Sequence, residues 1–273
     1  MMIFENFSAG YDRGFVIRGI SCRLDAGKIY ALIGPNAAGK TTMLRSIIRD
    51  VPLRSGGIII DGNDTAYLTS SELAKKVSYA PSEMHPAFDY SVLEFVAMGR
   101  FAVNRAFWET EEDINRTDEA ISAMGLEGVR HRSVAQLSSG QKQSCLLAQI
   151  VAKDTDIILL DEPAAHLDIA HRTDFFGKVL EMKNNARKSF IITFHDLNDA
   201  LNAADEFILL KEGEVAAVKK RDEINEETLS SLYGTELSIC EFSGGRRAVL
   251  PLIGHIGNFP SSEKALLGDI SKS

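Results

Sequence analysis

The sequence predicts an α/β fold with a parallel sheet, a β-rich start and a helical insert. Three short apolar runs, over residues 157–160, 189–194 and 206–210, alternate with helical stretches in the second half of the chain. Buried apolar strands that alternate with helices indicate a parallel sheet. The chain has 273 residues, of which 45% are hydrophobic and 25% charged, so it can bury the core of one large domain.

The first part of the chain carries the β-rich start. Strands are expected over residues 3–7, 15–24 and 29–33, and the last of these leads into a glycine-containing loop. A helix is expected from residue 40 to residue 48, and the run GGIIIDG over residues 56–62 predicts another strand.

The β signal fades from about residue 83 to residue 151. After the segment VSYAP, helices are predicted over residues 92–98, 111–124 and 140–152. This run of helices is the expected insert, and the apolar strand segments return after it.

Charge and cysteine content narrow the classes of function. The net charge of -8 and the pI of about 5.3 oppose binding to nucleic-acid phosphates, so no nucleic-acid partner is expected. The three cysteines are far apart and show no zinc-ligand spacing, which predicts a reducing, cytoplasmic setting. The start shows no targeting signal, and the longest apolar runs are only strand-sized, so any membrane role is expected to come through a partner.

The segment ALIGPNAAGKTT, residues 31–42, fits the phosphate-binding pattern G-x-x-x-x-G-K-[ST]. Gly34 and Gly39 allow tight turns, so that successive backbone N–H groups and the Lys40 cation can face phosphates. Thr41 supplies a hydroxyl for Mg²⁺. Ala37 stands where many such loops have glycine, but it keeps its N–H, and a left-handed backbone there would cost only about 1–2 kcal/mol. The sequence therefore predicts that the loop still holds phosphate.

The segment IILLDEP places two acids at the end of a predicted buried strand. Asp161 is the candidate to hold Mg²⁺ through its water shell. Glu162 is the candidate to orient or deprotonate the attacking water. An adjacent acid pair at a strand end is often only solvated, but the upstream phosphate loop favours the catalytic interpretation.

Four segments in order, GPNAAGKTT, QLSSGQKQ, LLDEPAAHLD and TFHDL, resemble the ATP-binding subunit of ABC transporters. The resemblance spans about residues 11–215. It implies a P-loop NTPase core with a parallel sheet, an N-terminal antiparallel β subdomain and a helical insert. Within one ABC ATPase domain, residues 1–82 and 152–220 would form the core with its β subdomain, residues 83–151 the helical subdomain, and residues 221–273 a C-terminal extension.

The resemblance also implies a role for individual residues in binding ATP and Mg²⁺. Tyr11 matches the aromatic residue that stacks on adenine, and His195 matches the histidine that contacts the γ-phosphate and helps to hold the water. The phosphate loop would comprise Gly34, Pro35, Asn36, Ala37, Ala38, Gly39, Lys40, Thr41 and Thr42. The residues that reach a second subunit's nucleotide would be Ser138, Ser139, Gly140, Gln141 and Asp168. Metal contacts would come from Thr41, Ser82 and Asp161.

The implied assembly is a head-to-tail homodimer with ATP, bound through a membrane permease subunit to the inner face of the cell membrane. A periplasmic or extracellular substrate-binding protein would belong to the same system. The segment HPAFDYSVLEFVAMGR, residues 85–100, is similar to the insert of importers for iron-siderophores, haem and cobalamin. That similarity implies a substrate of this group, with ferric chelates first.

Two residues depart from the family pattern. Ser82 stands where the family usually has a glutamine that touches Mg²⁺, and Ser139 replaces the first glycine of LSGGQ. These departures keep two alternatives open: a regulatory subunit that binds ATP but scarcely hydrolyses it, and a soluble ABC ATPase that acts on a non-transport partner.

Overall fold

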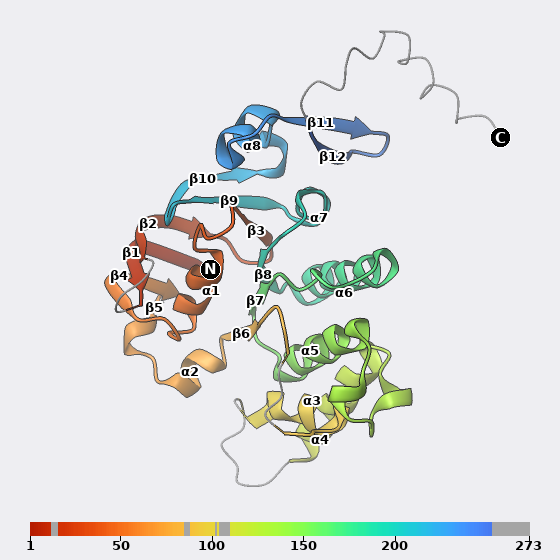
Figure 1. The fold of residues 1–273 in the computed structure, drawn as a ribbon. Helices are drawn as coiled ribbons and strands as arrows, with labels where there is room; N and C mark the ends of the chain where they lie inside the picture. Colours follow the sequence, from red (N-terminus) through yellow and green to blue (C-terminus); the bar gives the residue numbers. More distant parts are fainter. Residues whose placement is uncertain (12–15, 85–87, 102, 104–109, 253–273) are drawn as a thin grey trace, which may run out of the picture.

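The structure is a computed structural model that describes residues 1–11, 16–84, 88–101, 103 and 110–252. A six-stranded sheet crosses its centre in the order β10-β9-β3-β8-β7-β6 (Figure 1). From β9 to β6 all neighbours are parallel, and β10 alone pairs antiparallel to β9. The strands are β3 (Ile29–Ile33), β6 (Val77–Ala80), β7 (Ile157–Asp161), β8 (Ser189–Thr193), β9 (Glu206–Lys211) and β10 (Glu214–Lys220).

A second sheet of four antiparallel strands lies beside β10 in the order β2-β1-β4-β5 (Figure 1). Its strands are β1 (Met2–Gly10), β2 (Val16–Leu24), β4 (Leu53–Ile60) and β5 (Asn63–Asp64). The Arg18 N–H donates to the Gly213 carbonyl in the turn before β10, which ties the two sheets together.

The central strands are buried on both faces, and their alternating side chains enter two separate cores. Ile29, Ala31 and Ile33 of β3 pack into one core with the helices of the insert. Tyr30 and Leu32 of the same strand pack into the second core, which the helix α1 (Lys40–Ile47) and the antiparallel sheet complete. This two-sided burial explains why the strands read as continuous apolar runs rather than as alternating ones.

The helices cover the sheet in two groups. Next to the antiparallel sheet lie α1 (Lys40–Ile47) and α2 (Ser70–Ala74), while α3 (Val92–Phe101), α4 (Glu111–Ala123) and α5 (Ser139–Lys153) pack on one another at the far end of the molecule (Figure 1). A buried ion pair between Arg100 and Asp113, at 2.9 Å, joins α3 to α4. The short 3₁₀ helices are Thr65–Tyr67, Glu127–Val129, Val134–Gln136 and Arg221–Glu223.

The chain continues through α6 (Ile169–Ala186), α7 (Leu197–Ala203), α8 (Glu226–Tyr233) and a hairpin of β11 (Leu237–Phe242) and β12 (Arg246–Pro251). The hairpin is fixed to α7, because the Val249 N–H donates to Asn198 Oδ1 at 2.7 Å. Among the described residues, no helix has the length and apolar character needed to cross a membrane.

The expected strands and helices are present with small changes in their ends. The sequence did not predict β10, α8 or the β11–β12 hairpin, and residue 15, the predicted start of the second strand, lies outside the described residues. These missed strands are only partly buried and carry several charged side chains, such as Lys219, Lys220, Arg246 and Arg247. A strand that covers a sheet edge or an outer helix lacks the continuous apolar run that revealed the central strands.

Candidate nucleotide-binding and catalytic site

The phosphate loop joins the carboxyl end of β3 to the start of α1. Gly34 is required there by close packing, since a Cβ atom at this position would lie 2.0 Å from the Leu210 carbonyl oxygen. Gly39 has a φ of 106° and Ala37 a φ of 60°, so the alanine does adopt the left-handed backbone. In the described part of the chain, the N-cap of α1 is Gly39 and no side-chain hydrogen bond caps this helix start. The first turn therefore offers its backbone N–H groups to an anion.

Lys40 lies across this loop and is only 8% exposed. Its Nζ donates to the carbonyl oxygens of Gly34 at 2.8 Å and Pro35 at 3.1 Å. Burial lowers the pKa of Lys40, and the nearby negative charges of Glu162 and Asp161 oppose this shift. The positive charge of Lys40 and the negative charges of Asp161 and Glu162 are therefore close enough in the folded chain to attract one another.

Asp161 is held in place at the carboxyl end of β7. It is the register partner of Thr193 on β8, whose hydroxyl donates to Asp161 Oδ1 at 2.7 Å. Burial, and after it the negative charge of Asp161, raise the pKa of Tyr79 on the neighbouring strand β6. Asp161 is 4% exposed, so its carboxylate is fixed by neighbours rather than by solvent.

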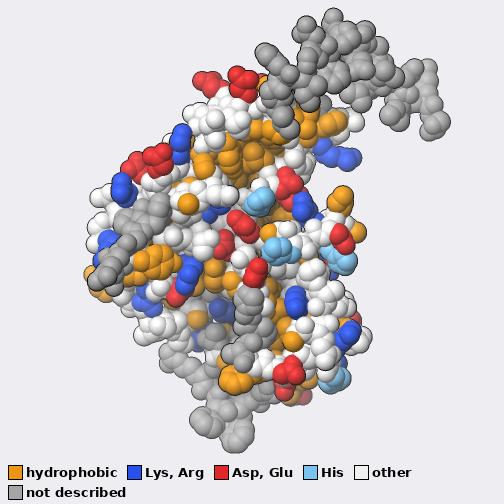
Figure 2. Space-filling view, in the orientation of Figure 1, with side chains coloured by type: hydrophobic (Ala, Val, Ile, Leu, Met, Phe, Trp, Pro, Cys, Tyr) orange, Lys and Arg blue, Asp and Glu red, His pale blue; other side chains and the backbone are white. Residues whose placement is uncertain are grey.

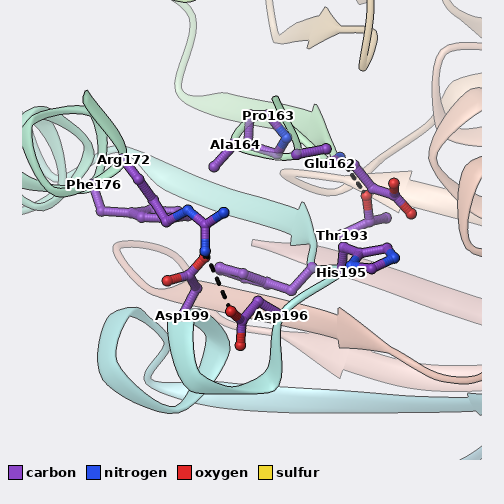
Figure 3. A pocket seen from close by; sticks show the side chains of 11 residues that line it. Glu162, Pro163, Ala164, Arg172, Phe176, Thr193, His195, Asp196 and Asp199 are labelled. Carbon is purple, nitrogen blue, oxygen red and sulfur yellow. Dashed lines mark hydrogen bonds and ion pairs between the residues drawn. The ribbon is translucent and has the colours of Figure 1, made fainter. Parts of the chain in front are cut away.

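Glu162 follows in an uncommon backbone conformation, with a φ of 44° directly before Pro163. The Glu162 N–H donates to Thr193 Oγ1 at 2.7 Å, so the same threonine holds both acids (Figure 3). A residue before proline normally adopts an extended backbone, and positive φ values cost about 1–3 kcal/mol. Such strain is often found at functional sites.

His195 lies two residues past the end of β8 and is exposed. It lines a pocket of about 80 Å³ together with Glu162, Pro163 and Thr193. Figure 3 shows the Glu162 carboxylate and the His195 ring at the same end of this pocket. In the space-filling view, acidic and histidine side chains gather near the middle of one face (Figure 2).

The segment LSSGQ forms the start of α5, and its polar groups are satisfied locally. Ser138 is the N-cap: its Oγ accepts from the Gln141 N–H, and Gln141 Oε1 accepts from the Ser138 N–H. Gly140 is packed against His171, whose ring atom Cδ2 would lie 2.4 Å from an added Cβ. Ser138 and Ser139 are exposed. Within the described residues, no hydrogen bond or ion pair joins residues 138–141 to the phosphate loop.

Asp168 caps α6 and is exposed, accepting from the His171 N–H at 2.9 Å. The backbone and ring hydrogen bonds from His171 lower the pKa of Asp168. Tyr11 is 42% exposed at the end of β1. Ser82 follows β6, and its carbonyl accepts from Gln143 Nε2 at 3.4 Å, so a glutamine of α5 does lie beside this position.

Sequence reasoning missed three residues around the site: Thr193, which bonds both acids, and Tyr79 and Tyr233, which lie near Asp161 and Gly34. Thr193 gave a usable signal, because it is the polar residue within the apolar run FIITF. Tyr233 gave none, since α8 brings it to the backbone of Gly34 from 199 positions away, and burial raises its pKa to about 12.

A family model described as ABC transporter matches residues 17–165 of this chain. The chain belongs to the ABC transporter family. It is 33% identical to the petrobactin import ATP-binding protein YclP of Bacillus subtilis over 88% of this chain and 95% of that protein. It is 31% identical to the ferric enterobactin transport ATP-binding protein FepC of Escherichia coli, over 91% and 93%.

Solved structures of ABC proteins share the fold. One is an ABC transporter of the metal-chelate type in an inward-facing conformation, with a TM-score of 0.80, 23% identity and coverage of 93% of this chain and 98% of that chain. Another is a dimeric bacterial ABC transporter cassette, with a TM-score of 0.71, 26% identity and coverage of 81% and 99%. The expected ABC ATPase fold is thereby confirmed, and the chain is an ATP-binding ATPase of this family.

Proposed function

We propose that this ABC ATPase powers an importer of iron chelates by hydrolysing Mg-ATP with the residues gathered at the carboxyl ends of β3, β7 and β8. The observation that carries the proposal is the convergence of Lys40, Glu162 and His195 at this edge, where ligands of open α/β sheets bind. The backbone N–H groups of the phosphate loop and the Lys40 cation would bind the phosphates, and Tyr11 would stack on adenine.

In the proposed mechanism, Glu162 orients the attacking water and accepts its proton, while His195 hydrogen-bonds the γ-phosphate. Thr193 keeps Glu162 in place by accepting its backbone N–H. Mg²⁺ would supply positive charge beside the phosphates. The Thr41 hydroxyl, the Asp161 carboxylate through water, and Ser82 would hold it, and these oxygen donors fit the ion's preference. Asp161 suits the role because the Thr193 hydroxyl holds its carboxylate in a buried position.

The second half of each nucleotide site would come from another subunit. Ser138, Ser139, Gly140 and Gln141 lie at the start of α5, where the two serines are exposed and Gly140 is buried, and this helix start could offer a hydroxyl and backbone N–H groups to a phosphate. Asp168 is likewise exposed beside them. We therefore propose a head-to-tail homodimer with ATP, which the dimeric cassette structure supports. Residues 83–151 would form the helical subdomain that faces the permease.

The proposed substrate class rests on the relatives. Besides the petrobactin and enterobactin proteins, a probable siderophore transport ATP-binding protein of Bacillus subtilis is 30% identical over 81% of this chain. The predicted importer-like insert at residues 85–100 favours the same class, although residues 85–87 lie outside the described part. A permease in the membrane and a substrate-binding protein outside it would complete the system.

The experiment is a measurement of Mg-dependent ATPase activity with and without the permease encoded beside this chain. The proposal expects basal hydrolysis that rises when the permease, in lipid vesicles, meets a binding protein loaded with a ferric siderophore. Hydrolysis that ignores the permease would support the non-transport ATPase instead. ATP binding without turnover in both conditions would support a regulatory subunit.

A further inference from the structure

Beyond the expected site residues, one arginine connects two functional segments. Arg172 lies in the first turn of α6, four positions after Asp168. Its Nη1 atom is 3.3 Å from Asp196 Oδ2 and 3.3 Å from Asp199 Oδ2. Figure 3 shows the guanidinium between these two carboxylates, in the pocket that also holds Glu162 and His195.

Asp196 is the residue directly after His195, and both of its carboxylate oxygens are engaged. Oδ1 accepts from the Asn198 N–H at 2.8 Å and so caps α7, while Oδ2 is the atom that contacts Arg172. The backbone that carries His195 is therefore tied to α7 on one side and to α6 on the other. His195 itself is exposed, and the contacts of Asp196 help to restrain the loop that carries it.

The packing around the guanidinium limits its freedom. Phe176, one turn later on α6, stacks on Phe194 with ring centroids 5.5 Å apart, and Phe194 directly precedes His195. The Arg172 side chain is 28% exposed, and its Nε is buried with no hydrogen-bond partner among the residues that the structure describes. The aromatic stack and the charged contacts thus connect the same two segments, residues 172–176 and residues 194–199.

The cluster is poorly arranged for stability alone. Burial and the neighbouring Asp196 charge raise the pKa of Asp199, although Arg172 opposes the shift. A partly buried charge cluster with an unsatisfied donor is weak evidence for a stabilising role, since replacing all of its charged groups with well-packed apolar ones is often neutral for folding. Groups with such perturbed environments in a functional pocket are candidates for a role in that function.

We propose that Arg172 is a positioning residue, which holds Asp196 and Asp199 so that His195 stays beside Glu162 in the geometry that ATP hydrolysis requires. In this role Arg172 acts through the loop of His195, by way of its contacts with Asp196 and Asp199. Since Arg172 shares the first turn of α6 with Asp168, it also links the loop of His195 to the segment proposed to meet the second subunit. This inference rests on the proposed role of His195.

The test compares Arg172→Gln, Arg172→Lys and a matched control, Lys183→Gln, in the purified full chain. Lys183 is also a cation of α6 and pairs with Asp205 at 2.7 Å, far along the helix from the pocket. We expect Arg172→Gln to lower kcat by about 10-fold to 100-fold, because small displacements of catalytic groups have effects of this size. The KM for Mg-ATP should change by less than about twofold, and Arg172→Lys should recover part of kcat. Lys183→Gln should leave both values unchanged.

A double-mutant cycle separates this inference from the proposed function. In a His195→Ala background, Arg172→Gln should lower kcat by less than about twofold, because the residue through which it acts is gone. An equal loss in both backgrounds, or full activity of Arg172→Gln, overturns the inference. Full activity of His195→Ala alone overturns the role of His195 itself. If Arg172→Gln does not fold, Asp199→Asn, which removes one charged partner, takes its place in the same cycle with the same expected outcomes.

Discussion

The two segments proposed to enclose ATP differ sharply in how the chain holds them. The phosphate loop is locked by its own fold: Gly34 packs against the Leu210 carbonyl, Lys40 bonds two loop carbonyls, and Asp161 is held by Thr193. The start of α5 is exposed at Ser138 and Ser139, and its capping bonds are entirely local. Only the first segment is fixed by residues from several strands.

This difference indicates that the phosphate loop and the start of α5 have different functions within one subunit, which we call the division of labour. A rigid loop can bind nucleotide by itself, because its backbone N–H groups are already arranged to meet a phosphate. A locally capped helix start contributes only when another surface brings a phosphate to it. The phosphate loop should therefore dominate ATP affinity, and the α5 start should dominate dimer formation and turnover.

The largest effect is expected from Glu162→Gln, which stops the chemistry while leaving both segments intact. Turnover should fall by roughly 10²–10⁴-fold, because the general base is lost. ATP binding should persist, so ATP should trap a dimer that elutes earlier in size-exclusion chromatography. A variant that hydrolyses at the wild-type rate would remove Glu162 from the catalytic role.

Measurements of ATP affinity should distinguish the phosphate loop from the start of α5 most clearly through the variant Lys40→Ala. Loss of a charged contact to phosphate should weaken ATP affinity by about 1.5–3 kcal/mol in calorimetry. The matched variant Ser138→Ala should leave the affinity of the monomer unchanged, because its hydroxyl serves only the α5 cap in the isolated chain. Equal affinities for Lys40→Ala and the wild type would contradict the division of labour.

Gly34→Ala and Gly140→Ala should show whether the phosphate loop or the start of α5 accommodates an added methyl group at the lower cost in stability. An added Cβ meets the backbone oxygen of Leu210 at 2.0 Å in the first case and the side chain of His171 at 2.4 Å in the second. Overpacking against fixed backbone should destabilise the fold by about 1–3 kcal/mol or more. Gly140→Ala should cost less than Gly34→Ala, since the exposed His171 side chain can move away. Thermal unfolding measures both, and equal losses would show that the α5 start is as rigid as the loop.

The smallest effect is expected at Ser82, where the family usually has glutamine. If the shorter side chain limits metal placement, Ser82→Gln should raise Mg-dependent turnover about tenfold, or about 1.4 kcal/mol, with nucleotide affinity nearly unchanged. A fall in turnover would mean that the loop, whose carbonyl contacts Gln143, is adapted to serine. Measuring kcat against magnesium concentration distinguishes these results. An unaltered kcat and magnesium dependence would show that position 82 does not control the metal.

The sequence predicted well whatever depends on local spacing. The apolar strand before the phosphate loop and the helix after it are both present, and Asp161 ends a buried strand with Glu162 directly after it. The roles of these residues in binding and catalysis stay predictions. A left-handed backbone at Ala37 was expected to cost little free energy, and Ala37 does adopt it. Ser138 and Asp168 are the N-caps of α5 and α6, as serine and aspartate directly before a helix commonly are.

What the sequence could not predict are contacts made between distant strands and helices. The Thr193 hydroxyl serves two acids only because β8 lies beside β7 in register. Arg172 and Asp199 look like surface charges of two helices until the fold brings them together at 3.3 Å. Roles that depend on a second subunit, such as those of Ser139 and Gly140, rest on resemblance because one chain does not contain their partners.

The order of strands in the central sheet has a consequence for biosynthesis. Strand β3, which leads into the phosphate loop, lies between β8 and β9, and both are encoded more than 150 positions later. At ordinary rates of translation the loop would wait roughly 10–40 s on the ribosome before its two neighbouring strands are made. A nascent chain that ends after β7 would carry the complete glycine pattern yet lack the Leu210 carbonyl against which Gly34 packs. We therefore expect ATP to recognise the loop only after β8 and β9 have been made, so that nucleotide does not guide the earlier steps of folding.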